Sequence, residues 1–409
     1  MTRCVMGESW ALDVPAPHPT RSARHPFRSH ATRFGVRILA AQTAATTSFV
    51  NPYFDPRKPH HRPGGFQNRY GDFVPRGIGD LLRWRWQAWR AGAPRPPRAL
   101  PPVVAPDLPG LRDNAAAGAA ARPTLTFIGH ASTLLQLPLG GGVLHVLTDP
   151  VFSERASPFG FVGPKRMQPP GLALAALPHI DVVLISHNHY DHLDDASVRA
   201  LARQPGGPPL FVVPLGLAPW MRRRGIDTVV ELDWWDAHPV AHGGATAEIT
   251  LTPSQHWSGR GLHDRLATLW GGYAVLAPDF HFFFAGDTGY SADFRDIRAH
   301  FAARQGTAQG GGFDLALLPI GAYEPRWFMR QQHNDPAEAV QIHRDVGARR
   351  SIGLHWGTFA LTDEPCDQPP RDLADACRAQ GLMPGTFDVM AIGETRAFAR
   401  RAATPQPSP

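Results

Sequence analysis

The sequence predicts an α/β protein whose main domain is built from two half-sheets. Short apolar runs that begin at residue 124 are separated by turns, as in an antiparallel meander, and more strand-like runs follow. Residues 315–354 are expected to form a strand, a helix and another strand, which indicates a second half-sheet. The chain has 409 residues and 43% hydrophobic content, enough to bury one large domain with an extension.

Composition divides the chain into four segments. Residues 1–50 mix Pro, Ser, Thr, Arg and Ala without periodicity, so we expect them to be disordered, like the tail 401–409. Residues 51–123 are rich in Pro and Arg and are expected to form a linker or wrapping arm with a short amphipathic helix at 78–90. The main domain should then span residues 124–400.

The helix expected at 78–90 has two interpretations. Its residues Leu81, Leu82, Trp86 and Trp89 fall near one face, and arginines are interleaved with them, as in segments that lie on membrane surfaces. The alternative is a helix that packs on the main domain. Residues 1–125 hold 18 Lys and Arg against 7 Asp and Glu, which would suit anionic lipid, although a compositional bias toward Arg explains the excess equally well.

The chain is expected in the cytoplasm, with peripheral membrane contact as an option. No apolar run approaches the roughly 20 residues that span a bilayer. The three cysteines, Cys4, Cys366 and Cys377, form no paired framework, and this favours a reducing compartment. The oligomeric state is left open.

The elements of the main domain follow from apolar runs and capping signals. Strands are expected at 124–128, 133–137, 143–148, 182–185, 211–213, 228–231, 247–252, 269–276, 280–284, 315–318 and 351–354. A helix capped by Asp194 or Asp195 should run to about Arg203. Asp335-Pro336-Ala337-Glu338 carries the start signals of a second helix at 336–346.

Four ligand-type side chains follow the strand at 182–185 within six residues. They are His187, His189, Asp191 and His192. Crowded polar groups after a buried strand cost free energy unless a cation or hydrogen bonds satisfy them, so we interpret this loop as a metal site for up to two ions. Imidazole and carboxylate together favour zinc, with manganese and iron as alternatives.

Further candidates stand at the ends of other predicted strands. His256, Asp287 and His355 each follow such a strand and are weak signals alone. Asp149 is either a partner of a ligand histidine or a turn residue before Pro150. His60 and His61 are either further ligands or surface residues, and we interpret them as surface residues because nothing nearby in the sequence completes a site.

Together these residues resemble the metallo-β-lactamase superfamily over about residues 124–395, in the order His-x-His-x-Asp-His, His, Gly-Asp, His. Several stretches are more closely similar to the N-acyl-phosphatidylethanolamine phospholipase D family. They are Ile128-Gly129-His130-Ala131-Ser132-Thr133, Leu147-Thr148-Asp149-Pro150-Val151-Phe152-Ser153, Ile185 to Asp194, Gln255-His256-Trp257, Gly286-Asp287-Thr288-Gly289-Tyr290, Ile320 to Met329, and His355-Trp356-Gly357-Thr358-Phe359.

The resemblance implies a four-layer αβ/βα sandwich with two zinc ions at one edge between two sheets. It assigns His187, His189 and His256 to the first zinc, Asp191, His192 and His355 to the second, and Asp287 to both. A hydroxide bridging the ions would attack phosphorus in line, with Asp191 orienting it. His333 would contact the phosphate or protonate the leaving group unless it only belongs to a capping loop, and Tyr190 would either bond the substrate or pack.

The function implied by the resemblance is release of an N-acylethanolamine from a phospholipid, leaving phosphatidic acid. The alternative is a metal-dependent hydrolase of a small soluble ester, lactone or phosphodiester, because the related lactonase branch carries the same ligand set. A nucleic-acid substrate is not expected, since no basic module with interleaved aromatic residues follows the arginine-rich start. A metal or lipid sensor without activity fits a complete two-metal set poorly.

Overall fold

The two expected half-sheets are present as two seven-stranded sheets. The computed structural model describes residues 50–71, 76–261, 263–306 and 311–401, which lie in one unit, Ser48–Pro409. The two segments for which we expect disorder fall outside the described residues, apart from Val50 and Arg401. The α/β prediction is confirmed.

The first sheet is built around an antiparallel meander. Its order is β16-β3-β4-β5-β6-β7-β8, with β5 to β8 parallel and the other neighbours antiparallel. The strands are β3 (Thr124–Gly129), β4 (Ser132–Leu139), β5 (Gly142–Thr148), β6 (Val182–Leu184), β7 (Leu210–Pro214), β8 (Val229–Leu232) and β16 (Thr395–Ala397). Six of these seven strands were expected from their apolar runs, and the short β16 was not.

The second sheet contains the later strands. Its order is β15-β14-β13-β12-β11-β10-β9, with β12 to β15 parallel. The strands are β9 (Ala237–His242), β10 (Ala245–Thr252), β11 (Gly272–Ala277), β12 (Phe280–Phe284), β13 (Leu315–Pro319), β14 (Ser351–Leu354) and β15 (Phe387–Asp388). The sequence missed β9 because it is an edge strand with two histidines and Pro239, and none of its residues is fully buried.

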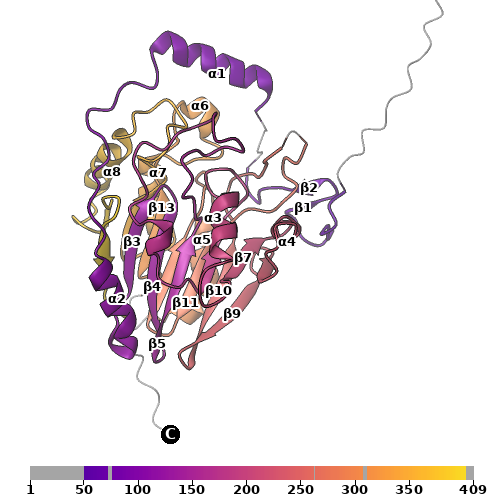
Figure 1. The fold of residues 1–409 in the computed structure, drawn as a ribbon. Coiled ribbons are helices and arrows are strands. Elements are labelled where there is room, and N and C mark those ends of the chain that lie inside the picture. The colour runs from indigo at the N-terminus through magenta and orange to yellow at the C-terminus, as the bar shows by residue number, and fades with distance from the viewer. Residues whose placement is uncertain (1–49, 72–75, 262, 307–310, 402–409) are drawn as a thin grey trace, which may run out of the picture. The chain divides into compact units, whose positions relative to one another are not determined.

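Apolar side chains place the two sheets face to face and put helices on their outer faces. The largest core cluster joins Leu135 and Val146 of the first sheet to Ile249 and Phe282 of the second. The outer face of the first sheet packs against α2 (Leu108–Ala116), α3 (Asp195–Leu201) and α4 (Ala218–Arg222). The outer face of the second packs against α5 (Asp293–Gln305), α7 (Pro336–Asp345) and α8 (Gln368–Ala379). The four layers are therefore helix, sheet, sheet and helix (Figure 1).

Capping chemistry explains where α7 begins. The carboxylate of Asp335 accepts a hydrogen bond from the backbone N–H of Glu338, and the Glu338 carboxylate accepts one from the N–H of Asp335. This is the expected capping box, with Pro336 at the first helical position. The prediction of α3 is also confirmed, although the helix ends at Leu201. The sequence analysis missed α5 and α8.

The arm is more structured than a linker. It contains a small hairpin, β1 (His61–Arg62) and β2 (Gly65–Phe66), the predicted helix α1 (Ile78–Ala91), and α2 with a 3-10 turn at Gly118–Ala120. A second 3-10 turn, Leu174–Ala176, and the short α6 (Arg326–Met329) complete the elements that the described residues form.

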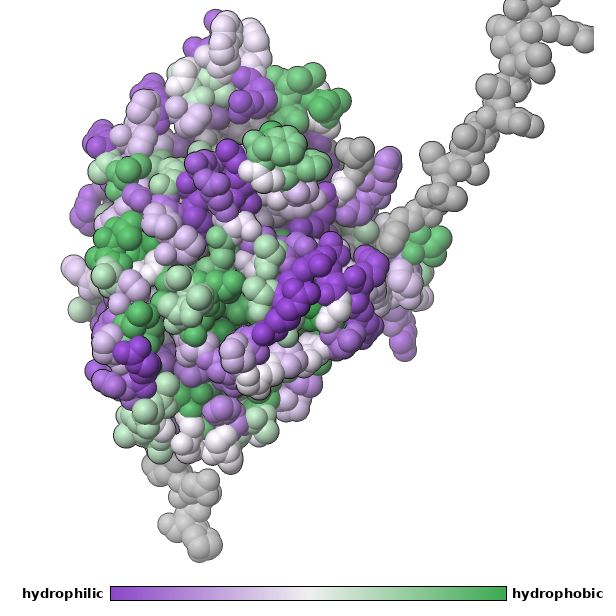
Figure 2. Space-filling model, in the orientation of Figure 1, coloured by the Kyte–Doolittle hydropathy of each residue, from purple (hydrophilic) through white to green (hydrophobic). Residues whose placement is uncertain are grey.

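Helix α1 packs on the main domain by one face and leaves an apolar face exposed. Trp84 is buried against Phe328, with ring centroids 4.8 Å apart, and its indole N–H donates to Asp363. Ile78, Leu82 and Trp89 remain 73%, 64% and 77% exposed on another face. Figure 2 shows apolar side chains at the surface at one end of α1. No helix among the described residues has the length and apolar character needed to cross a bilayer.

Candidate metal centre

Ligand-type side chains from both sheets gather where strands end. His187, His189, Asp191 and His192 follow β6, and His256, Asp287 and His355 follow β10, β12 and β14. Glycine lets Asp287 approach this loop, because a Cβ on Gly286 would lie only 2.7 Å from the Cβ of Ser186. The seven side chains expected as metal ligands are thus brought together at one end of the two sheets.

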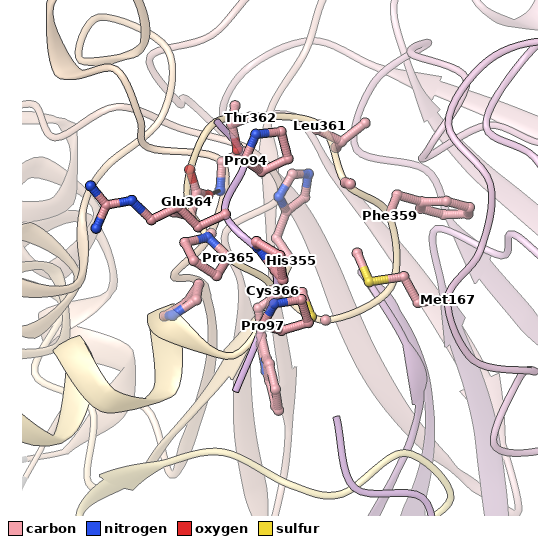
Figure 3. Close-up of a pocket in the computed structure, with 18 residues that line it drawn as sticks. Pro94, Pro97, Met167, His355, Phe359, Leu361, Thr362, Glu364, Pro365 and Cys366 are labelled. Carbon is pink, nitrogen blue, oxygen red and sulfur yellow. Dashed lines mark hydrogen bonds between the residues drawn. The ribbon is translucent and has the colours of Figure 1, made fainter. Parts of the chain in front are cut away.

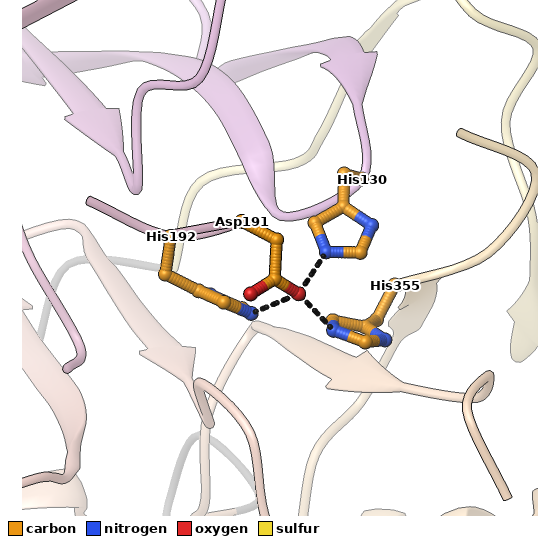
Figure 4. Close-up of side chains that lie close together, drawn as sticks. All are labelled: His130, Asp191, His192 and His355. Carbon is orange, nitrogen blue, oxygen red and sulfur yellow. Dashed lines mark hydrogen bonds and ion pairs between the residues drawn. The ribbon is translucent and has the colours of Figure 1, made fainter. Parts of the chain in front are cut away.

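These side chains form two neighbouring groups in which the donor atoms lie within 4.8 Å of one another. The first group contains His187, His189 and His256. The second contains His130, Asp191, His192 and His355, and Figure 4 shows three histidines around the Asp191 carboxylate. Every ring or carboxylate concerned is mostly or fully buried.

Asp287 lies between the two groups. Its Oδ2 atom is 3.2 Å from Nε2 of both His192 and His355, in the second group. It is 4.0 Å from Nε2 of His187 and 3.8 Å from Nε2 of His256, in the first. One carboxylate therefore faces ring nitrogens of both groups.

Hydrogen bonds to the Nδ1 atoms orient the rings of His192 and His256. Asp149 Oδ2 lies 2.7 Å from Nδ1 of His192, and the Asp149 carboxylate also accepts from the backbone and hydroxyl of Ser186. Nδ1 of His256 lies 2.9 Å from the carbonyl oxygen of Gln332. These partners hold the other ring nitrogen, Nε2, toward the centre, as second-layer partners of metal-binding histidines do.

His130 belongs to the site, and the sequence analysis did not include it among the candidates. Its Nε2 lies 2.9 Å from Asp191 Oδ2, and its backbone carbonyl accepts from the N–H of His355. The β3–β4 pairing shifts register between Phe127 and Gly129, and this bulge aims the next side chain at the site. A histidine directly after the predicted strand 124–128 was the available signal.

Three residues of the site have a strained backbone conformation. His130, Asp149 and His355 have φ angles of 60°, 33° and 61°, in the left-handed region that non-glycine residues rarely adopt. Such conformations cost about 1–3 kcal/mol each and persist where the surrounding structure imposes them. Their clustering around one group of side chains is typical of a functional site.

Arg260, another residue missed by the sequence analysis, fastens the histidine loop. It is largely buried, and its Nη1 donates to the carbonyl oxygens of Asn188 and Leu193 at 2.8 and 2.6 Å. Its guanidinium lies 4.0 Å from the centre of the Tyr190 ring, while the Tyr190 hydroxyl donates to the Arg260 carbonyl. Of the two expected roles of Tyr190, this geometry favours packing.

His333 lies at the edge of the centre. Its Nδ1 is 3.9 Å from Asp287 Oδ2, and its ring centroid is 5.2 Å from that of His256. Arg326 donates to the His333 carbonyl, which fixes the backbone there. The imidazole therefore stands next to the two groups of side chains, on the wall of the adjoining cavity.

Burial and neighbouring charges shift the titration of the centre. Burial holds the pKa of His187 well below its usual value and that of His256 at about 4. At His192 burial acts in the same direction, but the Asp287 and Asp191 charges outweigh it and hold its pKa well above the usual value. Burial would raise the pKa of Asp287, yet the surrounding histidines keep it well below the usual range. Burial would likewise raise the pKa of Asp191, but its histidine neighbours keep it well below the usual range, so Asp191 and Asp287 are both charged at neutral pH.

Unpartnered donor atoms show that the side chains fit a metal. Among the described residues, Nε2 of His192, Nε2 of His355 and Oδ1 of Asp287 are buried without a hydrogen bond, although carboxylate oxygens of Asp191 and Asp287 lie 3.2–3.5 Å from the two ring nitrogens. Buried polar atoms are almost always satisfied, so these atoms need a partner, and imidazole nitrogen with carboxylate oxygen is the donor set that zinc accepts.

A second histidine cluster in the arm behaves differently and corrects the expectation that His60 and His61 lie on the surface. Both are buried, and their Nε2 atoms lie 2.7 and 2.9 Å from the two carboxylate oxygens of Asp233. Lys58 also pairs with Asp233. Within the described chain no buried polar side-chain atom of this cluster lacks a partner. It is therefore a hydrogen-bonded cluster with a Lys58–Asp233 ion pair, and it fastens the arm to the residue that follows β8.

Two cavities adjoin the metal centre. The larger, about 430 Å³, is lined by His189, Asp191, Asp287 and His333 and is roofed by residues of α1, including Leu81 and Trp84. The smaller, about 240 Å³, is lined by His355 (Figure 3). Pro94 and Pro97 of the arm form part of its wall, with Met167, Phe359 and Cys366. The arm thus helps to build both cavities.

Comparison with known proteins identifies the family. The model of the Beta-lactamase superfamily domain matches residues 145–356, just over half of the chain. The chain belongs to the β-lactamase superfamily. This superfamily member is 43% identical over 280 residues to N-acyl-phosphatidylethanolamine-hydrolyzing phospholipase D 1 of Caenorhabditis elegans, a match that covers 66% of this chain and 74% of that protein. It therefore belongs to the branch of the superfamily that contains that relative.

This β-lactamase superfamily hydrolase is also similar to a second relative and to a solved structure. It is 38% identical over 232 residues to the mitochondrial N-acyl-phosphatidylethanolamine-hydrolyzing phospholipase D of Saccharomyces cerevisiae, covering 56% of this chain and 47% of that protein. The crystal structure of "a possible metal-dependent hydrolase" from Veillonella parvula DSM 2008 superposes with a TM-score of 0.52 at 18% identity, covering 68% of this chain and all of that one. The latter likeness shows the fold. The chain is a metallo-hydrolase with the metallo-β-lactamase fold.

Proposed function

We propose that the chain is a zinc-dependent phosphodiesterase that cleaves N-acyl-phosphatidylethanolamine into an N-acylethanolamine and phosphatidic acid. The observation that carries the proposal is the 43% identity over 280 residues to a phospholipase D of that name. The two groups of donor atoms, with Asp287 between them, support a site for two ions.

In this proposal each group of side chains holds one zinc ion. His187, His189 and His256 would hold the first, Asp191, His192 and His355 the second, and Asp287 both. When bound, two zinc ions acidify a shared water and polarise the phosphoryl oxygens.

The remaining residues of the centre would position the ligands and the substrate. Asp149 fixes the ring of His192 through its Nδ1, and His130 fixes the carboxylate of Asp191. His333, on the cavity wall, would contact the phosphate or give a proton to the leaving group. The apolar side chains under α1, among them Leu81, Trp84 and Phe328, would accommodate part of the lipid.

The proposal includes peripheral contact with an anionic membrane. The exposed apolar face of α1 carries Ile78, Leu82 and Trp89, and the same helix carries Arg83, Arg85 and Arg90. Apolar side chains can enter the lipid boundary while arginines meet anionic head groups. Because α1 also roofs the larger cavity, a lipid drawn from the membrane would meet the cavity beneath this helix.

A phosphorus NMR assay on the purified zinc-loaded protein tests the proposal. The protein should convert N-acyl-phosphatidylethanolamine in mixed micelles to a species with the shift of phosphatidic acid, and the Asp287→Asn variant should not. A panel with phosphatidylcholine, a lactone and a soluble phosphodiester is the comparison. Turnover confined to a soluble substrate would replace the lipid proposal with the small-substrate alternative.

A further inference from the structure

Two arginines line the larger cavity without a carboxylate partner. Arg76 precedes α1, and Arg265 lies in the loop after Trp257; both line the cavity that His189, Asp191 and Asp287 also line. Neither guanidinium forms an ion pair with any described residue, in contrast to the buried Arg401, which pairs with Asp314. Two positive charges therefore face a cavity beside the metal centre.

The structure holds these two side chains in place. Nη1 of Arg265 donates to the carbonyl oxygen of Arg76 at 3.1 Å, and Nη2 of Arg76 donates to the carbonyl oxygen of Trp327 at 2.6 Å. The guanidinium of Arg265 lies 4.5 Å from the ring centre of Trp257, and that of Arg76 lies 5.8 Å from that of Trp327. Stacking and hydrogen bonds thus orient both forks in advance of a ligand.

Both guanidinium groups keep an N–H donor that has no acceptor in the described part of the chain. The Nε atoms of Arg76 and Arg265 are buried and have no hydrogen-bond partner among the described residues. Burial alone lowers the pKa of Arg265, because no neighbouring carboxylate counteracts it. A partly desolvated cation without an anion costs free energy, and a bound oxyanion would remove that cost.

We propose that Arg76 and Arg265 form a subsite for a second oxyanion, a phosphate or carboxylate, that is distinct from the phosphodiester at the metals. The proposal rests on the proposed function, in which two dications balanced only by Asp191 and Asp287 already attract the singly charged diester. A further anion on the substrate matches the two guanidinium forks, which bind phosphate and carboxylate with paired hydrogen bonds. The favoured substrate is then a phosphodiester lipid whose head group carries an additional negative charge.

The first experiment measures binding without turnover. Inorganic phosphate is titrated into the zinc-loaded full chain by calorimetry, comparing the native protein, R76Q/R265Q and the charge-matched control R112Q/R122Q, whose arginines are exposed. We expect two phosphates per chain in the native protein and the control, and one in R76Q/R265Q. Equal stoichiometry and affinity in all three proteins would overturn the proposal.

The second experiment identifies the source of the anion. N-acyl-phosphatidylethanolamine and N-acyl-phosphatidylserine differ by one carboxylate, and their kcat/KM values are compared in mixed micelles. The native enzyme should prefer the serine lipid by at least about tenfold, the effect of a charge-assisted hydrogen bond, and R76Q/R265Q should lose that preference.

The outcomes separate this subsite from the proposed function. Arginine-dependent phosphate binding without a lipid preference would assign the subsite to free phosphate. An equal loss of kcat/KM for both lipids in R76Q/R265Q would place the arginines on the scissile phosphate and overturn the second-anion proposal. If neither lipid is hydrolysed, the proposed function fails, and the phosphate titration alone decides the subsite.

Discussion

Asp287 is the residue that faces both groups of donors in the candidate metal centre. Its Oδ2 atom faces ring nitrogens from five histidines at 3.2–4.0 Å. Its other carboxylate oxygen has no hydrogen bond to any residue that the structure describes. A neutral side chain of the same shape would leave the histidines in place and remove a negative charge that faces both groups of donors.

Replacing Asp287 with Asn should therefore abolish activity without unfolding the protein. We expect the rate to fall by about 10²–10³ or more, since that is the cost of losing one well-placed electrostatic contact. Zinc content should fall as well, while circular dichroism stays unchanged. Asp227→Asn, which changes an exposed carboxylate outside the proposed ligand set, is the control. Near-native turnover by Asp287→Asn would show that the ligand assignment is wrong.

At the scale of elements, polar contacts tie the arm to the helices of the second sheet. Arg69 of the arm lies 3.1 Å from Asp293 and 3.0 Å from Asp296, both in α5, and the Tyr70 hydroxyl donates to Asp296. Burial raises the pKa of Asp293 to about 6. The ionised form is therefore disfavoured in the folded state, and Arg69 partly offsets this.

The Arg69→Gln variant should show this coupling as a pH-dependent loss of stability. Because the folded pKa of Asp293 exceeds its unfolded value of 3.8, its contribution to stability is full below pH 3.8 and is lost as pH rises through about 6. Without Arg69 the buried carboxylate is left unpaired above that pH. We expect a cost of about 1–3 kcal/mol at pH 8 and much less at pH 5. Urea unfolding of both proteins at each pH measures it, and a pH-independent difference would contradict the coupling.

Helix α1 is the element whose two faces have different roles. Changing its exposed Trp86 and Trp89 to Ser should weaken binding to anionic vesicles at any salt concentration, whereas changing Arg83, Arg85 and Arg90 to Gln should weaken it mainly at low salt. Vesicle flotation at two salt concentrations measures both. The control Arg112→Gln should bind like the native protein. Unchanged flotation of both α1 variants would exclude this helix as the membrane contact.

The same elements show how far the sequence can predict the structure. Apolar runs predicted most strands, and polar residues at their ends predicted the seven side chains that the structure brings together. Local capping signals predicted α7. The pairing of His60 with Asp233 and the packing of Trp84 on Phe328 could not be predicted, because both join residues more than 170 positions apart. His130 was missed because a single histidine after a strand carries little information without its partner Asp191.

At the scale of the whole molecule, the centre joins the two sheets. Its side chains follow β3 and β6 on one sheet and β10, β12 and β14 on the other. A ligand that binds only the folded chain stabilises it by mass action. Metal bound between the sheets should therefore stabilise the entire main domain and not only the loops.

Elemental analysis should find close to two zinc ions per chain after reconstitution. Removing them with a chelator should lower the melting temperature by several degrees, because the buried donors then lose their ligand. The Asp287→Asn variant is the matched comparison and should respond less to the chelator. A chain that holds one zinc or none after reconstitution would contradict the two-ion proposal.

The pairing of β16 with β3 has a consequence for synthesis on the ribosome. β3 is buried along its full length, and its outer edge pairs with Thr395–Ala397 and bonds to the backbone of Gly393 and Glu394, all late in the chain. A nascent chain that has not yet reached these residues presents an uncovered apolar strand edge, which is a template for pairing with other chains. A stop codon shortly before residue 395 should thus produce aggregation, not a slightly smaller enzyme, although every proposed metal ligand would already have been made.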